Sequence, residues 1–303
     1  MASAGVIAAK IGRSIVRRSG PWMLLSPFVL GSVLLVGFPI ALTVPLAFYE
    51  YDGLTQPLWR GTWNFSLIFA DPVFVTALRN SLLFVALAVP VRMAAAFVLA
   101  MLLQHRRRGT ALYRACVFLP TVMPDVAYAL IWLWIFNPLY GPLNIGLGAL
   151  GLPRLAWLVD PDTALPAIEI RSLLQIGEGF VLLLAGLRDV PQEYYDVGMV
   201  EGAGRVQLFR FITLPLMAPW LLLLTIRDIA VTAQNAFVAA YLMTGGGPYY
   251  ATLFVPLLVH EEAFDHLRFG DAGAMMLVMY VASSALLFLA FIGIQAWRHD
   301  HGD

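Results

Sequence analysis

Six long apolar runs constrain the fold of this chain more than any other feature of its sequence. A helix needs about 20 mostly apolar residues to cross the hydrocarbon core of a membrane. Inside lipid, only helices and closed barrels satisfy every backbone hydrogen bond. The sequence therefore predicts an all-α, polytopic membrane protein with six transmembrane helices, at residues 22–48, 80–103, 111–136, 164–187, 216–242 and 272–296.

The composition agrees with a membrane protein and gives no sign of other classes. Of the 303 residues, 60% are hydrophobic and 13% are charged, against about 25% charged residues in an ordinary soluble domain. Basic and acidic residues balance at 19 each, so no nucleic-acid partner is indicated. The lone cysteine, Cys116, cannot form a disulfide within the chain. We expect one transmembrane domain over 21–297, an N-terminal segment over 1–20 and a tail over 298–303.

The basic residues near the ends of the spans predict the orientation of the chain. With the N-terminus inside, twelve of the nineteen basic residues lie in inside segments, four lie outside and three fall within spans. This excess predicts that both termini are cytoplasmic. The loop at 188–215 is then cytoplasmic, whereas the stretches 49–79, 137–163 and 243–271 face outward.

The cytoplasmic loop at 188–215 begins with the pattern of a short helix. Asp189 followed three residues later by Gln192 is a capping-box pattern, and Pro191 suits a first helical turn. These residues predict a helix over about 190–201.

The string Gly202-Ala203-Gly204 ends that helix, because glycine permits left-handed backbone. A second short helix follows, before Pro215 opens span five. Such a loop either rests on lipid headgroups as a connector or presents a helix to a groove on a partner protein.

The same loop resembles the cytoplasmic EAA loop of permease subunits in binding-protein-dependent ABC importers. That pattern runs from a Glu-Ala-Ala triplet through a glycine to a closing Ile-x-Leu-Pro. Here those places hold Asp196-Val197-Gly198, Gly202 and Ile212-Thr213-Leu214-Pro215. Asp196 keeps the carboxylate, whereas valine and glycine replace the two alanines, and Gly198 weakens the helix by up to about 1 kcal/mol.

The resemblance covers nearly the whole chain. The string from Thr244 to Pro248, Thr-Gly-Gly-Gly-Pro, is typical of one of the two non-identical permease subunits, the one paralogous to the larger maltose-permease chain. Three further stretches are similar to the first outer loop, the third span and the last outer loop of carbohydrate permeases, at 61–84, 118–147 and 241–278.

This resemblance implies a type I ABC importer permease fold in the inner (plasma) membrane of a bacterium or archaeon. It implies a heterodimer with a second permease, two ATPase subunits inside and an extracytoplasmic sugar-binding protein outside. Alternating access is the implied mechanism. The residues it assigns to ATPase coupling are Asp196, Gly198, Glu201, Gly202, Ile212 and Pro215.

The chain carries no nucleotide-binding motif of its own. No Gly-x-x-x-x-Gly-Lys-Ser/Thr string is present, and the only lysine is Lys10. We therefore expect ATP and Mg²⁺ on a partner ATPase, and neither a cofactor nor a catalytic site on this chain. His260 and His266 are too far apart for the i, i+4 pair of a helical zinc site, so no metal is expected. We interpret that segment as a hydrated outer helix or a contact for the binding protein.

Polar residues inside span four indicate a substrate path, because ionisable groups at membrane depth face the protein interior or a wet cavity. Arg171, Gln175 and Glu178 have the i, i+4, i+7 spacing of one helical face. One interpretation is a carbohydrate-binding wall, since hydroxyls need paired donors and acceptors. The alternative is a structural ion pair, either between Arg171 and Glu178 or between subunits.

Span five adds two further candidates, Gln234 and Asn235, which lie deep in the span. Arg227 and Asp228 lie nearer the cytoplasmic end, and we interpret them as an inner salt bridge or as snorkelling side chains.

Span three contributes Asp125, and Tyr128 and Trp132 are candidates to stack on a sugar ring. Arg92 in span two is a buried charge whose partner the sequence does not identify. Bends are expected at Pro90, Pro120 and Pro124.

These features together predict a permease for an oligosaccharide or related polyol. An anionic sugar or a glycerol phosphate derivative is the alternative cargo, with Arg171 as its counter-ion. A secondary transporter working without an ATPase would show internal repeats, and a membrane enzyme would show a catalytic constellation near a span end; neither signal is visible.

Overall fold

The computed structural model describes residues 24–105 and 108–300. The predicted N-terminal segment 1–20 and the end of the predicted tail 298–303 lie outside these residues. So do Arg106, Arg107 and the four basic residues of the N-terminal segment, and the orientation of the chain stays a prediction.

The regular structure of the described residues is helical except for one short antiparallel strand pair, β1–β2. The predicted all-α class is therefore confirmed. The elements, with η marking π-helical turns, are η1 Val33–Gly37, α2 Phe38–Leu46, β1 Tyr49–Glu50, β2 Leu58–Trp59, α3 Trp63–Ala70, α4 Pro72–Leu103, α5 Thr110–Val122, α6 Asp125–Ile135, α7 Pro142–Ala149, α8 Pro161–Leu173, α9 Gly177–Asp189, α10 Gln192–Val200, α11 Arg205–Leu208, η2 Phe209–Thr213, α12 Leu214–Met243, α13 Val255–His260, η3 Glu261–Asp265 and α14 Phe269–Asp300.

Six spans are present if each of two bent helix pairs counts as one. Four unbroken helices in the described chain are long and apolar enough to cross a membrane. The bent pairs are α5 with α6, at 104°, and α8 with α9, at 44°. The unbroken spans are Leu24–Leu46, Pro72–Leu103, Arg205–Thr232 and Phe269–Gly293.

The bend expected at Pro124 within 111–136 is confirmed, whereas the break within 164–187 corrects the expectation of a continuous helix there. Pro124 has no N–H and forces Met123 into an extended conformation, which ends α5. Pro90 and Pro120, also expected to bend their helices, lie within α4 and α5, which run on past them.

The break between α8 and α9 is fitted against the end of α5. The Gly177 N–H donates to Thr121 Oγ1 at 3.0 Å. A Cβ at Gly177 would lie 2.5 Å from that oxygen and 2.8 Å from the Phe118 Cα, so only glycine fits.

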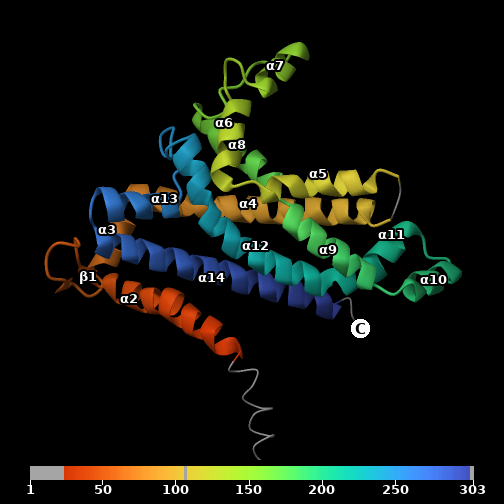
Figure 1. The fold of residues 1–303 in the computed structure, drawn as a ribbon, viewed down its shortest axis with the longest axis horizontal. Coiled ribbons are helices and arrows are strands. Elements are labelled where there is room, and N and C mark those ends of the chain that lie inside the picture. Colours follow the sequence, from red (N-terminus) through yellow and green to blue (C-terminus); the bar gives the residue numbers. More distant parts are fainter. Residues whose placement is uncertain (1–23, 106–107, 301–303) are drawn as a thin grey trace, which may run out of the picture.

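The long helices run side by side, and the other elements extend from this bundle (Figure 1). Helix α4 packs against α9 and α12, and α12 packs against α14. Helices α10 and α11 lie at one end of the bundle, and β1 and α3 lie at the opposite end. Helices α6, α7 and α8 project to one side of the bundle (Figure 1).

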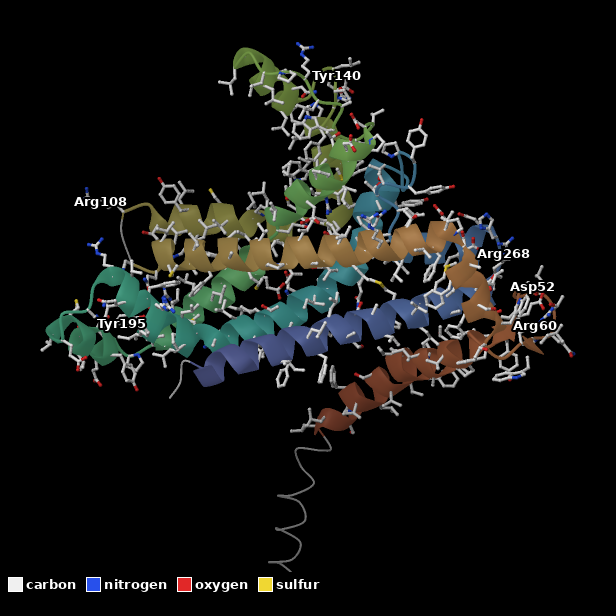
Figure 2. The ribbon with its side chains drawn as sticks, turned by 180° about the vertical axis from the view of Figure 1, so that it is seen from behind. Asp52, Arg60, Arg108, Tyr140, Tyr195 and Arg268 are labelled. Atoms are coloured by element: carbon white, nitrogen blue, oxygen red, sulfur yellow. The ribbon has the colours of Figure 1, made fainter. Side chains whose placement is uncertain are left out.

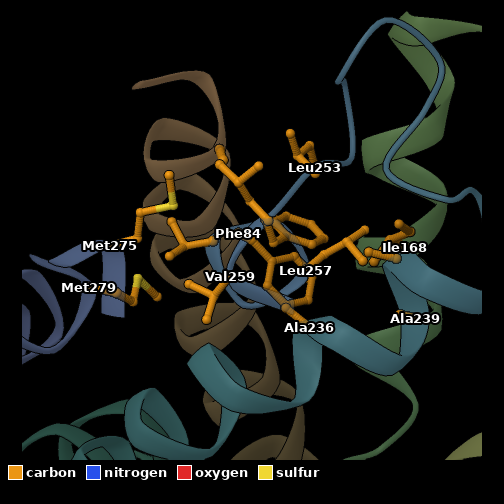
Figure 3. Packing of buried hydrophobic residues seen from close by; sticks show 14 of the residues in the cluster. Phe84, Ile168, Ala236, Ala239, Leu253, Leu257, Val259, Met275 and Met279 are labelled. Carbon is orange, nitrogen blue, oxygen red and sulfur yellow. The ribbon is translucent and has the colours of Figure 1, made fainter. Parts of the chain in front are cut away.

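Two large apolar cores and one small cluster hold the described part of the bundle. The first, farther from α10–α11, gathers side chains from α4, α8, α12, α13 and α14 (Figure 3). The second lies nearer α10–α11, between α4, α9 and α12. Its buried members include Phe97, Phe180, Leu183, Met217 and Leu224.

The first span is attached to the bundle at its C-terminal end. Asn64 Nδ2 donates to the carbonyl oxygens of Ala47 and Tyr49, at 3.0 and 2.8 Å. A Cβ at Gly273 of α14 would lie 3.2 Å from the Ala47 nitrogen and 3.4 Å from its Cα. A glycine at 273 therefore lets α14 approach the backbone of the chain just after α2.

We predict that Gly273→Val destabilises the protein, because the added side chain separates α14 from Ala47. Overpacking of this kind costs about 1–3 kcal/mol, so the thermal midpoint of the purified protein should fall by several degrees. Gly293→Val is the matched control, since a Cβ there meets nothing within 4 Å on the same helix. Equal midpoints for the two variants would show that the approach at Gly273 does not matter.

Candidate functional site

A buried ion pair lies between the two apolar cores. Arg92 of α4 donates from Nη2 and Nε to Asp228 Oδ2 of α12, at 2.8 and 3.2 Å. Arg92 Nη2 also donates to Thr232 Oγ1, and Thr232 Oγ1 donates to the Asp228 carbonyl at 2.6 Å. Arg92 and Asp228 are 7% and 9% exposed. Asp228 thus belongs to a buried salt bridge and does not snorkel, and Arg92 has the partner that the sequence did not identify.

A second ion pair, half-exposed, joins α9 to α12. Arg227 Nη2 donates to Glu178 Oε2. The salt-bridge interpretation of Arg227 is therefore confirmed. The alternative pairing of Arg171 with Glu178 is wrong, because Glu178 pairs with Arg227 and the carboxylate nearest Arg171 is that of Asp125.

The predicted single face of Arg171, Gln175 and Glu178 does not exist as a continuous helical stripe. Arg171 lies in the last turn of α8, Gln175 lies in the break and Glu178 lies in the first turn of α9. Gln175 Nε2 instead donates to Asp125 Oδ1 of α6, at 3.1 Å.

Arg171 is buried on the α6 side of the break, at 3% exposure. Its guanidinium lies 5.0 Å from the centre of the Tyr128 ring, and its Nη2 is 4.0 Å from Asp125 Oδ1. The Tyr128 hydroxyl donates to the Arg171 carbonyl at 3.1 Å. Arg171 therefore stabilises the contact between α6 and α8.

These groups surround a polar cavity of about 360 Å³ at the two helix breaks. The residues after α5 and after α8 form one side, and α4, α9 and α12 form the rest. Its lining residues are Arg92, Met93, Thr121, Met123, Pro124, Asp125, Gln175, Ile176, Glu178, Gly179, Leu224, Arg227, Asp228, Val231 and Asn235. Such a wall can donate to and accept from several hydroxyl groups at once.

The remaining residues predicted for the substrate path lie in different parts of the structure. Asn235 lines this cavity, whereas Gln234 lines a mostly apolar one of about 320 Å³ between α12, α13 and α14. Tyr128 and Trp132 are buried in the first core, and neither lines the polar cavity. Their stacking on a sugar is therefore not supported by this arrangement.

Sequence reasoning did not place Arg92, Thr121 or Asp228 in the cavity. The available signal was the pair of opposite charges at Arg92 and Asp228, each inside an apolar run. Opposite charges at membrane depth pair with each other, but several acidic residues in other spans were equally eligible.

The loop at 188–215 folds as two helices packed at a glycine. A Cβ at Gly198 of α10 would lie 2.6 Å from Leu208 Cδ2 and 3.2 Å from Ile212 Cδ1. The hydroxyls of Tyr195 and Thr213 share a hydrogen bond of 3.0 Å. Gly198 thus lowers the helix propensity of α10 but allows this close packing. The packing explains why a glycine stands where the motif has an alanine.

The turn between the two helices requires a glycine at 202, where φ is 87°. The predicted capping box at Asp189 is wrong, because α9 extends through Asp189 and Pro191 is the N-cap of α10. A cap forms instead at α11, where the Gly204 N–H donates to Gln207 Oε1 at 2.7 Å.

The loop exposes apolar and acidic side chains together. Asp196 and Glu201 are exposed. Val200 is 89% exposed, so its apolar side chain does not stabilise the fold of the loop by packing. The exposed apolar residues are Tyr194, Val197, Met199, Val200, Val206 and Phe211.

The segment containing His260 and His266 consists of the end of α13, the π-helical turn η3 and the residue after it. Glu262 pairs with His266 at 3.2 Å and with Arg268 at 3.4 Å. Burial, and next the charge of Asp265, raise the pKa of Glu261. Over the described residues no group of three or more potential metal ligands gathers.

Comparison with known proteins places this geometry in context. Residues 92–298 match the protein family described as "Binding-protein-dependent transport system inner membrane component". The chain is 32% identical to the probable ABC transporter permease protein YesP of Bacillus subtilis, over 99% of this chain and 98% of that one. It is 30% identical to the sulfoquinovosyl glycerol transport system permease protein SmoG of Agrobacterium fabrum, over 86% of this chain and 85% of that one.

The fold also resembles a solved structure. A chain of a bacterial ABC transporter involved in the import of the acidic polysaccharide alginate superposes with a TM-score of 0.77, at 19% identity, over 95% of this chain and 99% of that chain. This likeness confirms the expected importer permease fold.

We predict that Arg92→Leu strongly destabilises the protein, because it leaves Asp228 buried without a counter-charge. Breaking a buried ion pair from one side costs about 3–5 kcal/mol, whereas replacing both partners by apolar residues is often neutral. The thermal midpoint in detergent should fall sharply for the single variant and recover in Arg92→Leu with Asp228→Leu. Arg188→Leu, at an exposed position of α9, is the control. A double variant no more stable than the single one would contradict this account.

Proposed function

Because this chain belongs to the binding-protein-dependent transport system inner membrane components, and is thus a permease subunit of an ABC importer, we propose that its cargo is a sugar, an oligosaccharide or a related polyol. The named cargo of one relative, sulfoquinovosyl glycerol, is a sugar joined to a polyol, and its sulfonate group makes it an anionic example. The resemblance of the sequence to carbohydrate permeases supports the same assignment.

The polar cavity is the proposed contact site for the cargo. Gln175 and Asn235 offer amides, and Asp125 and Glu178 offer carboxylates, on facing sides of one space. A sugar presents several hydroxyl groups, each a donor and an acceptor, which this mixed wall can satisfy.

An anionic cargo held by Arg171 receives no support from this arrangement. Arg171 is buried against Tyr128 and does not line the cavity. Among the described lining residues, Arg92 and Arg227 are each already paired with a carboxylate. A negative charge on the cargo would need a cation from another subunit.

The main support for the proposed mechanism is the helical connection between the loop and the cavity. Helix α11 continues through η2 into α12 without a break in helical structure. The widened π turn η2 immediately precedes Pro215, whose ring lacks an N–H and disfavours regular α-helical pairing. Helix α12 then carries Arg227, Asp228 and Asn235. A displacement of the loop is therefore transmitted along one helix to the cavity wall.

The proposed partners follow from this path. The exposed loop contacts an ATPase subunit that binds ATP and Mg²⁺, through Asp196, Glu201 and the apolar side chains beside them. ATP chemistry belongs to that separate subunit, of which two are present. A second permease completes the cavity, an extracytoplasmic binding protein delivers the sugar, and both termini are cytoplasmic. ATP binding shifts the population between inward-open and outward-open states.

We predict that Val200→Asp abolishes uptake while the protein remains folded in the membrane. Because Val200 is almost fully exposed, its replacement removes nothing from the fold, so a loss reports on a partner. Co-purification of the ATPase should fall at least tenfold. Leu54→Asp, at an exposed position of the opposite end, should leave that association intact. Normal uptake by Val200→Asp would mean that the loop only connects two spans.

We predict that Asn235→Ala lowers sugar uptake at least tenfold, whereas Gln234→Ala has little effect. Gln234 and Asn235 are adjacent in α12 and both carry a side-chain amide, but they line different cavities. Uptake of labelled sugar into vesicles containing the whole transporter measures the difference. Equal effects of the two substitutions would remove the polar cavity from the substrate path.

A further inference from the structure

Glu169 of α8 carries a buried oxygen that has no partner. Its Oε1 is shielded from solvent, and no hydrogen bond from the described residues reaches it. None of the ion pairs found in the described parts of the chain includes Glu169. Because buried polar atoms in native proteins nearly always have a partner, this oxygen needs one that the present conformation does not supply.

The cation on the same helix does not serve Glu169. Residues two positions apart lie about 200° apart around a helix, so Arg171 faces a different neighbour. Its guanidinium lies over the Tyr128 ring of α6, and its Nη2 is 4.0 Å from Asp125 Oδ1. A partner for Glu169 must therefore come from another helix.

The cation that acts on Glu169 is Arg92. Helix α8 packs against α4, and the charge of Arg92 on α4 interacts with the Glu169 carboxylate. The hydrogen bonds of Arg92 to Asp228 and Thr232 of α12 leave from Nε and Nη2. A guanidinium has five N–H donors, so Arg92 can bind a second carboxylate when it turns. One buried cation therefore stands between carboxylates on two different helices and is hydrogen-bonded to the one on α12.

The two carboxylates are connected differently to the loop at 188–215. Asp228 lies on α12, which continues from the loop through η2 without a break in helical structure. Glu169 lies beyond two interruptions, because residues 190–191 are extended between α9 and α10 and a 44° bend separates α8 from α9. Figure 2 shows Tyr195 of the loop and Arg268 at opposite ends of the long helices, and α12 runs inward from the loop end. A displacement of the loop therefore moves Asp228 more than it moves Glu169.

Such a movement of α12 would separate Asp228 from Arg92. A buried guanidinium left without a counter-charge is strongly destabilising, so the movement needs a second carboxylate near Arg92. We propose that Glu169 is a positioning residue that receives Arg92 during transport: the guanidinium exchanges Asp228 for Glu169 Oε1 and is paired at both ends of the movement. Asp228 lines the polar cavity, where water hydrates it after the exchange. This inference rests on the proposed function, which requires α12 to move.

A double-mutant cycle tests the pairing without transport. Asp228→Asn removes the present counter-charge but keeps the shape of the side chain, so Arg92 should turn to Glu169. Glu169→Gln alone should leave the thermal midpoint in detergent almost unchanged. The double variant should lose far more than the sum of the two single losses, because Arg92 then has neither carboxylate.

The matched control for this cycle is Asp162→Asn, at an exposed position of the same helix. Combined with Asp228→Asn, it should add nothing to the loss. Shifts that are simply additive for Glu169→Gln and Asp228→Asn would overturn the exchange, independently of what the protein transports.

Uptake by the whole transporter gives a second readout. Glu169→Gln should lower the maximal rate of sugar uptake at least tenfold and leave KM and the co-purified ATPase unchanged, because Glu169 is absent from the described cavity lining. Glu169→Asp should restore part of the rate, since it returns the charge that Arg92 requires. Asp162→Asn should transport normally.

The outcomes separate the exchange from the proposed function. Normal uptake by Glu169→Gln, in a transporter that Val200→Asp inactivates, would overturn the exchange and leave the proposed function standing. Equal losses with Glu169→Gln and Glu169→Asp would show that the shape of the side chain matters and its charge does not, which would also overturn the exchange alone. Failure to isolate any ATPase with the unsubstituted chain would overturn both.

Discussion

The structure depends on one buried ion pair, because a charge at membrane depth must find its partner inside the protein. Arg92 and Asp228 join α4 to α12 at the level where one apolar core ends and the other begins. Neither charge could remain in this bundle without a counter-charge. The pair therefore fixes the relative position of the two helices and allows a polar cavity to exist inside an apolar assembly.

The breaks in two spans follow from the same requirement for polar groups at membrane depth. Each break frees backbone groups that lipid cannot satisfy. At Gly177 the freed N–H is bonded to Thr121, the side chain of the neighbouring broken span. Because both breaks border the same cavity, the irregular backbone and the polar side chains are gathered into one place, where water or a hydroxyl-rich cargo can reach them.

The chain also separates its exposed surfaces by chemistry. The loop of α10 and α11 exposes carboxylates beside apolar side chains, the end near β1 exposes charges, and the segment from α7 to Val159 exposes mostly apolar side chains. Glycines and one asparagine shape two of these surfaces: Gly198 and Gly202 form the loop, and Asn144 bonds α7 to the segment that follows it. Rigid presentation lowers the ordering cost of binding a partner.

The sequence by itself determined the six spans and the helix–turn–helix loop, because hydropathy, length and glycine placement act on residues close together in the chain. Tertiary structure decided which polar residues meet. Arg92 and Asp228 are 136 positions apart, and Gln234 and Asn235 differ only in the side of α12 that each occupies. The stripe of Arg171, Gln175 and Glu178 failed because it assumed an unbroken helix, whereas the fit of Gly177 against Thr121 ends one helix and redirects the next. The side of a helix that a residue occupies depends on the rotation of that helix and on its contacts with other helices, which no local sequence pattern encodes.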